Sequence, residues 1–158
     1  MIALSHPQAA GLFAALHHVA AFTVAGTIAA ELAVLQPAPS LVQARRLQRI
    51  DLLYGVAAGA LLAIGLLRVA YFEKGWSYYW HDVFFVLKLL SFLAAGLLSI
   101  YPTRVYLSWN AALRGGVAPP LSPLTHRRVR LCLRLEVLAL LLIVVCAALM
   151  ARGFGYRP

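Results

Sequence analysis

Two adjacent histidines and a glutamate interrupt an apolar stretch near the start of the sequence, LHHVAAFTVAGTIAAEL, which covers residues 16–32. These titratable residues are His17, His18 and Glu31. An imidazole removed from water is biased to its neutral form, which is the form that binds metal ions and haem iron. His17 and His18 are therefore candidate metal or haem ligands, and hydrogen bonding between helices is the structural alternative.

Neighbouring residues of a helix point about 100° apart, so the two histidines cannot face the same partner. His17 shares its face with Val24, Thr27, Ile28 and Glu31. The face of His18 consists of small residues, by which membrane helices approach closely: Gly11, Ala14, Ala15, Ala21, Ala25 and Ala29. The sequence does not decide which histidine is the ligand.

Lys88 and Arg68 are predicted to lie at the same membrane depth as the histidines. An ionisable residue inside a span costs several kcal/mol and indicates a functional site by default. Lys88 could snorkel to the headgroups, bind iron, or pair with a haem propionate beside Arg68. The second axial position of a haem is left open between Lys88, His81 and no ligand.

A second polar group is predicted toward the opposite side of the membrane. It contains Glu31, Tyr54, Tyr101, Arg134 and Glu136. We expect Glu31 and Glu136 each to pair with a nearby arginine, because a buried charge is less costly when it is matched. Glu31 and Tyr101 are candidates for proton exchange, and Lys88, Glu31 and Tyr101 are the candidate catalytic residues.

The elements that must position these residues are membrane helices. The chain has 158 residues, of which 63% are hydrophobic and 12% charged, and its mean hydropathy is +0.83. Apolar stretches long enough to cross a bilayer cover residues of about 10–35, 50–71, 83–107 and 129–151. The sequence therefore predicts an all-α protein, an integral membrane four-helix bundle forming a single transmembrane domain over residues 1–158.

The basic residues determine the predicted orientation. The formal net charge is +9, but arginines cluster in the first and third connections rather than along one face, which favours membrane orientation over nucleic-acid binding. By the positive-inside rule these connections are cytoplasmic, so both termini are expected outside a bacterial inner membrane.

Ser40 followed by Gln43 is a capping-box pattern and predicts that the second helix starts near Leu41. Cys132 and Cys146 are about 21 Å apart along one helix and cannot form a disulfide with each other.

Three parts of the sequence resemble a bacterial family of four-span inner-membrane proteins of unknown function. They are the stretch ALHHVAAFTVAGTIAAEL, the segment from LLRVAYFEKGWSYYWHD to the end of span three, and the arginine-rich entry to span four. The chain also resembles, more distantly, the J-type membrane protoporphyrinogen oxidases and the copper-resistance D proteins. The shared features are a histidine in span one, the outer Gly75-Trp76 pair and a lysine in span three. The oxidase resemblance implies haem b binding through His17 or His18, with Lys88 taking part.

The function predicted from these residues is haem b binding by a membrane oxidoreductase or electron carrier. Its substrate would be hydrophobic and membrane-soluble, for example a porphyrinogen or a quinone. One alternative is a non-enzymatic accessory or assembly subunit, in a larger membrane complex or a homo-oligomer. Another is a transporter of a small solute or metal ion, which requires a solvated path joining the two polar groups.

Overall fold

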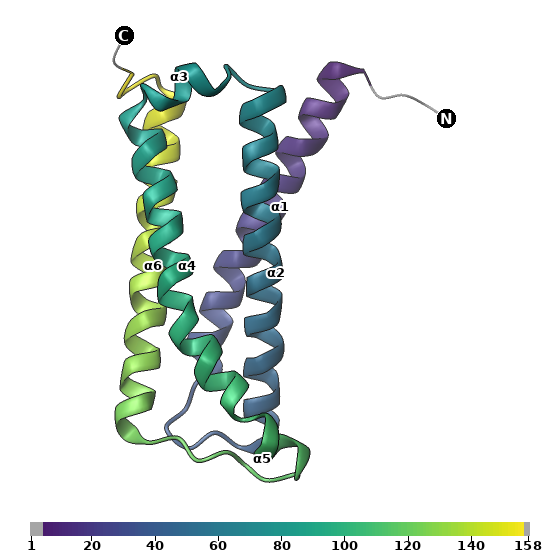
Figure 1. The fold of residues 1–158 in the computed structure, drawn as a ribbon, viewed down its shortest axis with the longest axis vertical. Helices are drawn as coiled ribbons and strands as arrows, with labels where there is room; N and C mark the ends of the chain where they lie inside the picture. The colour runs from purple at the N-terminus through teal and green to yellow at the C-terminus, as the bar shows by residue number, and fades with distance from the viewer. Residues whose placement is uncertain (1–4, 157–158) are drawn as a thin grey trace.

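Four long helices form most of the computed structural model, which describes residues 5–156 (Figure 1). They are α1 (His6–Val34), α2 (Leu41–Tyr71), α4 (Val83–Ser108) and α6 (Pro123–Ala151). Two short helices, α3 (Trp76–Trp80) and α5 (Asn110–Arg114), lie in the connections. All four long helices are long and apolar enough to cross a membrane. The predicted all-α four-helix membrane bundle is confirmed.

Polar residues fix the starts of three long helices. Helix α2 begins at Leu41, as predicted, and the Ser40 side chain accepts a hydrogen bond from the backbone N–H of Gln43 at 3.3 Å. Ser122 caps α6 in the same way through Thr125. Asp82 caps α4, because its Oδ1 accepts hydrogen bonds from the backbone N–H groups of Phe84 and Phe85. These side chains satisfy donors that a helix start leaves unpaired.

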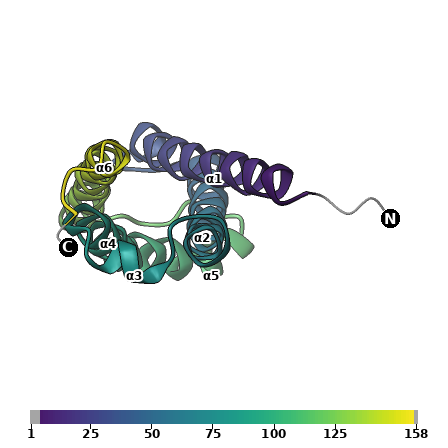
Figure 2. The same ribbon diagram turned by 90° about the horizontal axis from the view of Figure 1, so that it is seen from above.

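The long helices are arranged as two pairs. Helix α1 packs mainly on α2, and α4 packs mainly on α6, with few contacts between the pairs. The start of α1, the end of α6 and the short helix α3 lie at one end of the bundle, which we call the terminal end (Figure 1). Residues 35–40 and the segment from α5 to residue 122 lie at the other, which we call the loop end. The pairs are separate at the terminal end and converge toward the loop end, as the view from above also indicates (Figure 2).

Three buried apolar clusters hold the helices together. The terminal-end cluster contains Val69, Tyr79 and Phe85. The middle cluster contains Val24, Ile28, Tyr54 and Ala57. The loop-end cluster is the largest and contains Leu35, Ala44, Leu47, Tyr106, Trp109, Leu113, Val129 and Leu133. Most residues of these buried clusters therefore lie away from the terminal end.

Many large apolar side chains point outward from the bundle. Phe22 on α1, Leu52 on α2 and Val144 on α6 are all more than 60% exposed. Such exposure is unusual for a protein surrounded by water and is typical of helices surrounded by lipid. Cys132 and Cys146 are both free thiols on α6, as their predicted separation requires.

Candidate functional site

A pocket of about 150 Å³ lies between the two helix pairs, in the half of the bundle nearer the terminal end. It is partly open to the surroundings, and most of its lining is apolar. Five helices contribute to it, so it is a product of the tertiary fold. The lining residues are His17, Leu61, Leu62, Gly65, Leu66, Arg68, Val69, Glu73, Tyr79, Phe85, Lys88, Leu89, Phe92, Ile143 and Met150.

His17 enters this pocket from α1. Its ring lies against the backbone of α2 at Gly65, where an added Cβ would be 3.2 Å from His17 Cε1. His17 Nδ1 is buried and has no hydrogen-bond partner within residues 5–156. Buried polar atoms are nearly always paired, so an unpaired nitrogen on an imidazole that lines a pocket is unusual.

His18 does not reach the pocket. It is exposed, and its Nδ1 lies 2.7 Å from the carbonyl oxygen of Ala14 in its own helix. The small-residue face that contains His18 is exposed or only partly buried, so it is not the face by which α1 packs within residues 5–156. The buried face of α1 is instead that of His17, with Ala20, Val24, Thr27, Ile28 and Glu31.

Two cationic side chains line the same pocket as His17. Arg68 Nη2 lies 2.6 Å from Glu73 Oε1 in an ion pair that is partly exposed. Lys88 Nζ lies 5.7 Å from the centre of the Phe85 ring, and the part of the chain that the structure describes places no carboxylate within 4 Å of it. With a neutral His17, the pocket has two positive groups and one negative group, so its charge complements an anionic ligand.

Tyr79 closes the pocket from α3. Its hydroxyl donates a hydrogen bond to Glu73 Oε2 at 3.3 Å, so Glu73 connects Arg68 to α3. Burial, together with the negative charge of Glu73, raises the pKa of Tyr79 to about 12. The phenol therefore remains a neutral hydrogen-bond donor at any physiological pH.

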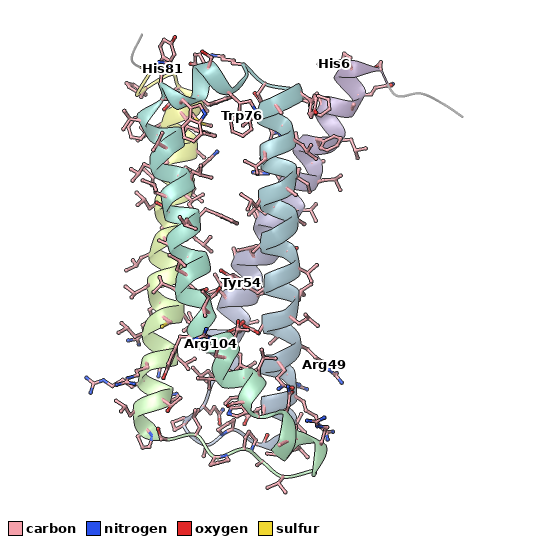
Figure 3. All side chains as sticks on the ribbon, in the orientation of Figure 1. His6, Arg49, Tyr54, Trp76, His81 and Arg104 are labelled. Atoms are coloured by element: carbon pink, nitrogen blue, oxygen red, sulfur yellow. The ribbon has the colours of Figure 1, made fainter. Side chains whose placement is uncertain are left out.

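His81, the other candidate second ligand, lies outside the pocket. It is exposed at the terminal end (Figure 3), and its Nδ1 lies 2.6 Å from the carbonyl oxygen of Ser77. The structure thus brings together His17, Arg68 and Lys88 of the predicted site residues. It does not bring His18 or His81 to them.

A second group of polar residues is buried nearer the loop end. Glu31 and Glu136 are only 2% and 1% exposed, and Asp51 on α2 is 9% exposed. Tyr54 on α2 and Tyr106 on α4 lie beside these acidic groups, and Tyr54 is between the helix pairs in Figure 3. Asp51 Oδ1 accepts a hydrogen bond from Thr103 at 2.7 Å. We call Glu31, Asp51 and Glu136 the carboxyl cluster.

The predicted pairing of Glu31 and Glu136 with arginines is wrong. Within residues 5–156 the one ion pair joins Arg68 to Glu73, at the other end of the bundle. The arginine nearest in sequence to Glu136, Arg134, is exposed, because it points about 160° away from Glu136 around α6. Tyr101 packs against the loop-end cluster and is only half-buried.

Comparison with known protein families identifies the family of this chain. A model of predicted membrane proteins, DUF2214, matches residues 9–155, which include the pocket and the carboxyl cluster. The chain belongs to the DUF2214 family. No curated protein and no solved structure matches it. The membership confirms the predicted membrane family of unknown function and supplies no activity.

In this DUF2214 protein an apolar layer separates the two polar sites. Val24, Ile28 and Ala57 are buried in it, and Leu61 both packs against them and lines the pocket. A transporter requires a solvated path between the two sites. The packing of the middle cluster therefore gives no support to the transport alternative.

The sequence did not indicate every residue of the pocket and the carboxyl cluster in this DUF2214 protein. Glu73 and Tyr79 lie between the second and third predicted spans, and Asp51 lies at the start of the second predicted span. A signal for Asp51 exists in the sequence, because it lies one helical turn before Tyr54 and starts an apolar run. Gly65 has no such signal, since its role depends on the approach of α1.

Proposed function

We propose that this protein binds haem b in the pocket, with His17 as the iron ligand, and acts as an electron carrier or oxidoreductase. A membrane-soluble molecule such as a quinone or a porphyrinogen would be its substrate. The membrane would be a bacterial inner membrane, with the terminal end facing outward. The distant resemblance to J-type protoporphyrinogen oxidases supports the same cofactor.

The observation that carries the proposal is the His17 ring, which lines the pocket and whose Nδ1 is buried without a hydrogen-bond partner within residues 5–156. A neutral imidazole that lines an apolar pocket is the kind of ligand that haem iron takes from a protein. When bound, haem would supply one-electron chemistry, and the protein would tune it through the ligand, burial and nearby charge. The contact with Gly65 holds the His17 ring in place.

Arg68 and Lys88 would bind the acidic groups of the ligand. Haem carries two propionates, and a guanidinium or ammonium group in a site poorly accessible to water interacts strongly with a carboxylate. Glu73 and the Tyr79 hydroxyl fix the position of Arg68 before a ligand arrives. Lys88, with no carboxylate partner among the described residues, is free either to bind a propionate or to stabilise negative charge on a substrate.

The size of the pocket limits how a ligand can bind. Its volume, about 150 Å³, accommodates roughly one aromatic ring, whereas sites for large ligands occupy about 300–1,000 Å³. A quinone headgroup therefore fits within the enclosed space. A macrocycle would use the open side of the pocket as well.

Visible absorption of the detergent-purified protein, expressed with ample haem, tests the proposal. We expect a haem Soret band in the wild type and in His18→Ala, and its loss in His17→Ala. The two variants are matched, because they remove neighbouring imidazoles from one helix and only His17 faces the pocket. Monodisperse elution and helical circular dichroism would show that both fold. A band that depends on His18, or a colourless wild type, would contradict the proposal.

An accessory role in a larger membrane complex is the second candidate. The observation that favours it is the exposed small-residue face of α1, which includes Gly11, Ala15, Ala25 and Ala29. Faces of this kind allow another membrane helix to approach closely. A partner that co-purifies in fixed ratio with colourless protein would support this role over haem binding.

A further inference from the structure

The carboxyl cluster lies outside the pocket and takes no part in the proposed haem site. The chain has only five acidic residues, and three of them meet here from α1, α2 and α6. Asp51 and Glu136 both lie close enough to Glu31 to interact with its charge. Acidic side chains that are rare in a sequence and converge from three helices have been brought together by the fold.

The surroundings of the cluster do not neutralise it. Of the cationic side chains in residues 5–156, none lies within 4 Å of its carboxyl oxygens. One oxygen each of Glu31 and Glu136 is buried without a hydrogen-bond partner. Burying three unpaired negative charges together would cost far more than the stability of a folded protein.

The hydroxyl of Tyr106 indicates what neutralises the buried carboxyl groups. Tyr106 on α4 is fully buried, its hydroxyl faces Glu31, and that hydroxyl also has no hydrogen-bond partner among the described residues. The residues that the structure describes contain no set of three ligands arranged to hold a metal ion. Protons neutralise carboxylates without a coordination shell and supply the donors that the unpaired oxygens lack.

We propose that the carboxyl cluster is a proton-binding site, which stores exchangeable protons inside the bundle and exchanges them with the loop end through Asp51. Asp51 is the most exposed of the three carboxyl groups, and its partner Thr103 is only half-buried. The loop-end cluster covers Glu31 and Glu136 below, and the middle cluster separates them from the pocket above. The site is thus independent of whether haem binds.

Other titratable groups around the cluster are few. Tyr54 faces Glu136 from α2, Tyr106 faces Glu31 from α4, and Cys132 lies near Glu136 on α6. None of these residues is a cation at neutral pH. The carboxyl groups are therefore the groups that gain and lose protons.

Infrared spectroscopy of the full-length protein in detergent, at pH 7 and without added haem, tests this site directly. We expect a carbonyl stretch of protonated carboxylic acid in the wild type, reduced in Glu31→Gln and in Glu136→Gln and reduced further in the double variant. Glu73→Gln is the matched control and should leave the band unchanged, because Glu73 lies outside the carboxyl cluster and forms an ion pair with Arg68. Transfer to D₂O should shift the band, several-fold more slowly in Asp51→Asn.

Absence of the band in the wild type, or a band that neither glutamine substitution reduces, would overturn the proposal. So would a rise in melting temperature with sodium chloride, but not with choline chloride, that Glu31→Gln abolishes. If the variants do not fold, wild-type protein made with carboxyl-¹³C glutamate gives the same test. The band should then move to lower frequency, and an unshifted band would exclude the glutamates.

Discussion

At the scale of single residues, the two adjacent histidines have opposite surroundings. His17 lies against Gly65 and lines the pocket, and its Nδ1 is unpaired within residues 5–156, whereas His18 is exposed and contacts a carbonyl of its own helix. The difference follows from the 100° rotation between neighbouring helical residues. Only one of them can share a cavity with Arg68 and Lys88, and the pocket makes that residue His17.

Gly65→Ala is predicted to weaken ligand binding. A Cβ at this position would be 3.2 Å from His17 Cε1, so the ring must move by a few tenths of an ångström. We expect haem affinity to fall about tenfold, equivalent to about 1.4 kcal/mol, as measured by spectroscopic titration of the purified protein.

Gly59→Ala is the matched control on the same helix, because an added Cβ there meets nothing within 4 Å. Both substitutions gain the same helix propensity. Equal affinities in the two variants would show that the contact between Gly65 and His17 does not orient the ligand.

At the scale of elements, the residues after α6 are attached to the start of α4. The backbone N–H of Val83 donates a hydrogen bond to the carbonyl oxygen of Gly155 at 3.1 Å, and the rings of Tyr78 and Tyr156 stack at 4.6 Å between centres. These contacts hold the terminal ends of α3, α4 and α6 together. They therefore help to define one wall of the pocket, although no residue after Met150 lines it.

Gly155→Ala is predicted to break this attachment. Gly155 has φ of +97°, and an added Cβ would lie 2.5 Å from Phe84 Cδ2. Gly153, with φ of +75° and no atom within 4 Å of an added Cβ, provides a control that shares the backbone cost without the collision. We expect Gly155→Ala to lower the free energy of unfolding by about 1–3 kcal/mol more than Gly153→Ala, measured by denaturation in mixed micelles. Equal losses would show that the attachment gives no stability.

At the scale of the whole molecule, the two helix pairs form one bundle with distinct ends. The pairs are separate in one half and converge in the other (Figure 1). Residues of the first half line the pocket, and the carboxyl cluster is buried nearer the loop end. Arginines surround the loop end, including Arg45, Arg46, Arg114, Arg127 and Arg128. Because basic residues are retained on the cytoplasmic side, this distribution predicts that the loop end faces the cytoplasm.

Labelling of introduced cysteines tests this orientation. Ser77 is exposed in α3 at the terminal end, and Val117 is 61% exposed at the loop end. In a background without Cys132 and Cys146, a membrane-impermeant thiol reagent should label Ser77→Cys in intact cells. It should label Val117→Cys only after permeabilisation. The reverse pattern would show that the bundle has the opposite orientation.

The sequence by itself determined the helices, because the properties that create them are local. Apolar length predicted the four spans, Ser40 and Gln43 predicted the start of α2, and the spacing of Cys132 and Cys146 excluded a disulfide. Helical periodicity also gave the two faces of α1, one with His17 and one with His18. It did not indicate which face would be buried, and the small-residue face proved to be the exposed one.

Only the tertiary structure decided which residues meet. The contact of His17 with Gly65 joins residues 48 positions apart, and the carboxyl cluster joins residues that span more than 100 positions. A buried carboxylate in a sequence predicts an oppositely charged partner, so arginines were expected beside Glu31 and Glu136. Which partner it meets depends on how rigid helices rotate and tilt against one another, and each rotation is set by the packing of the whole bundle.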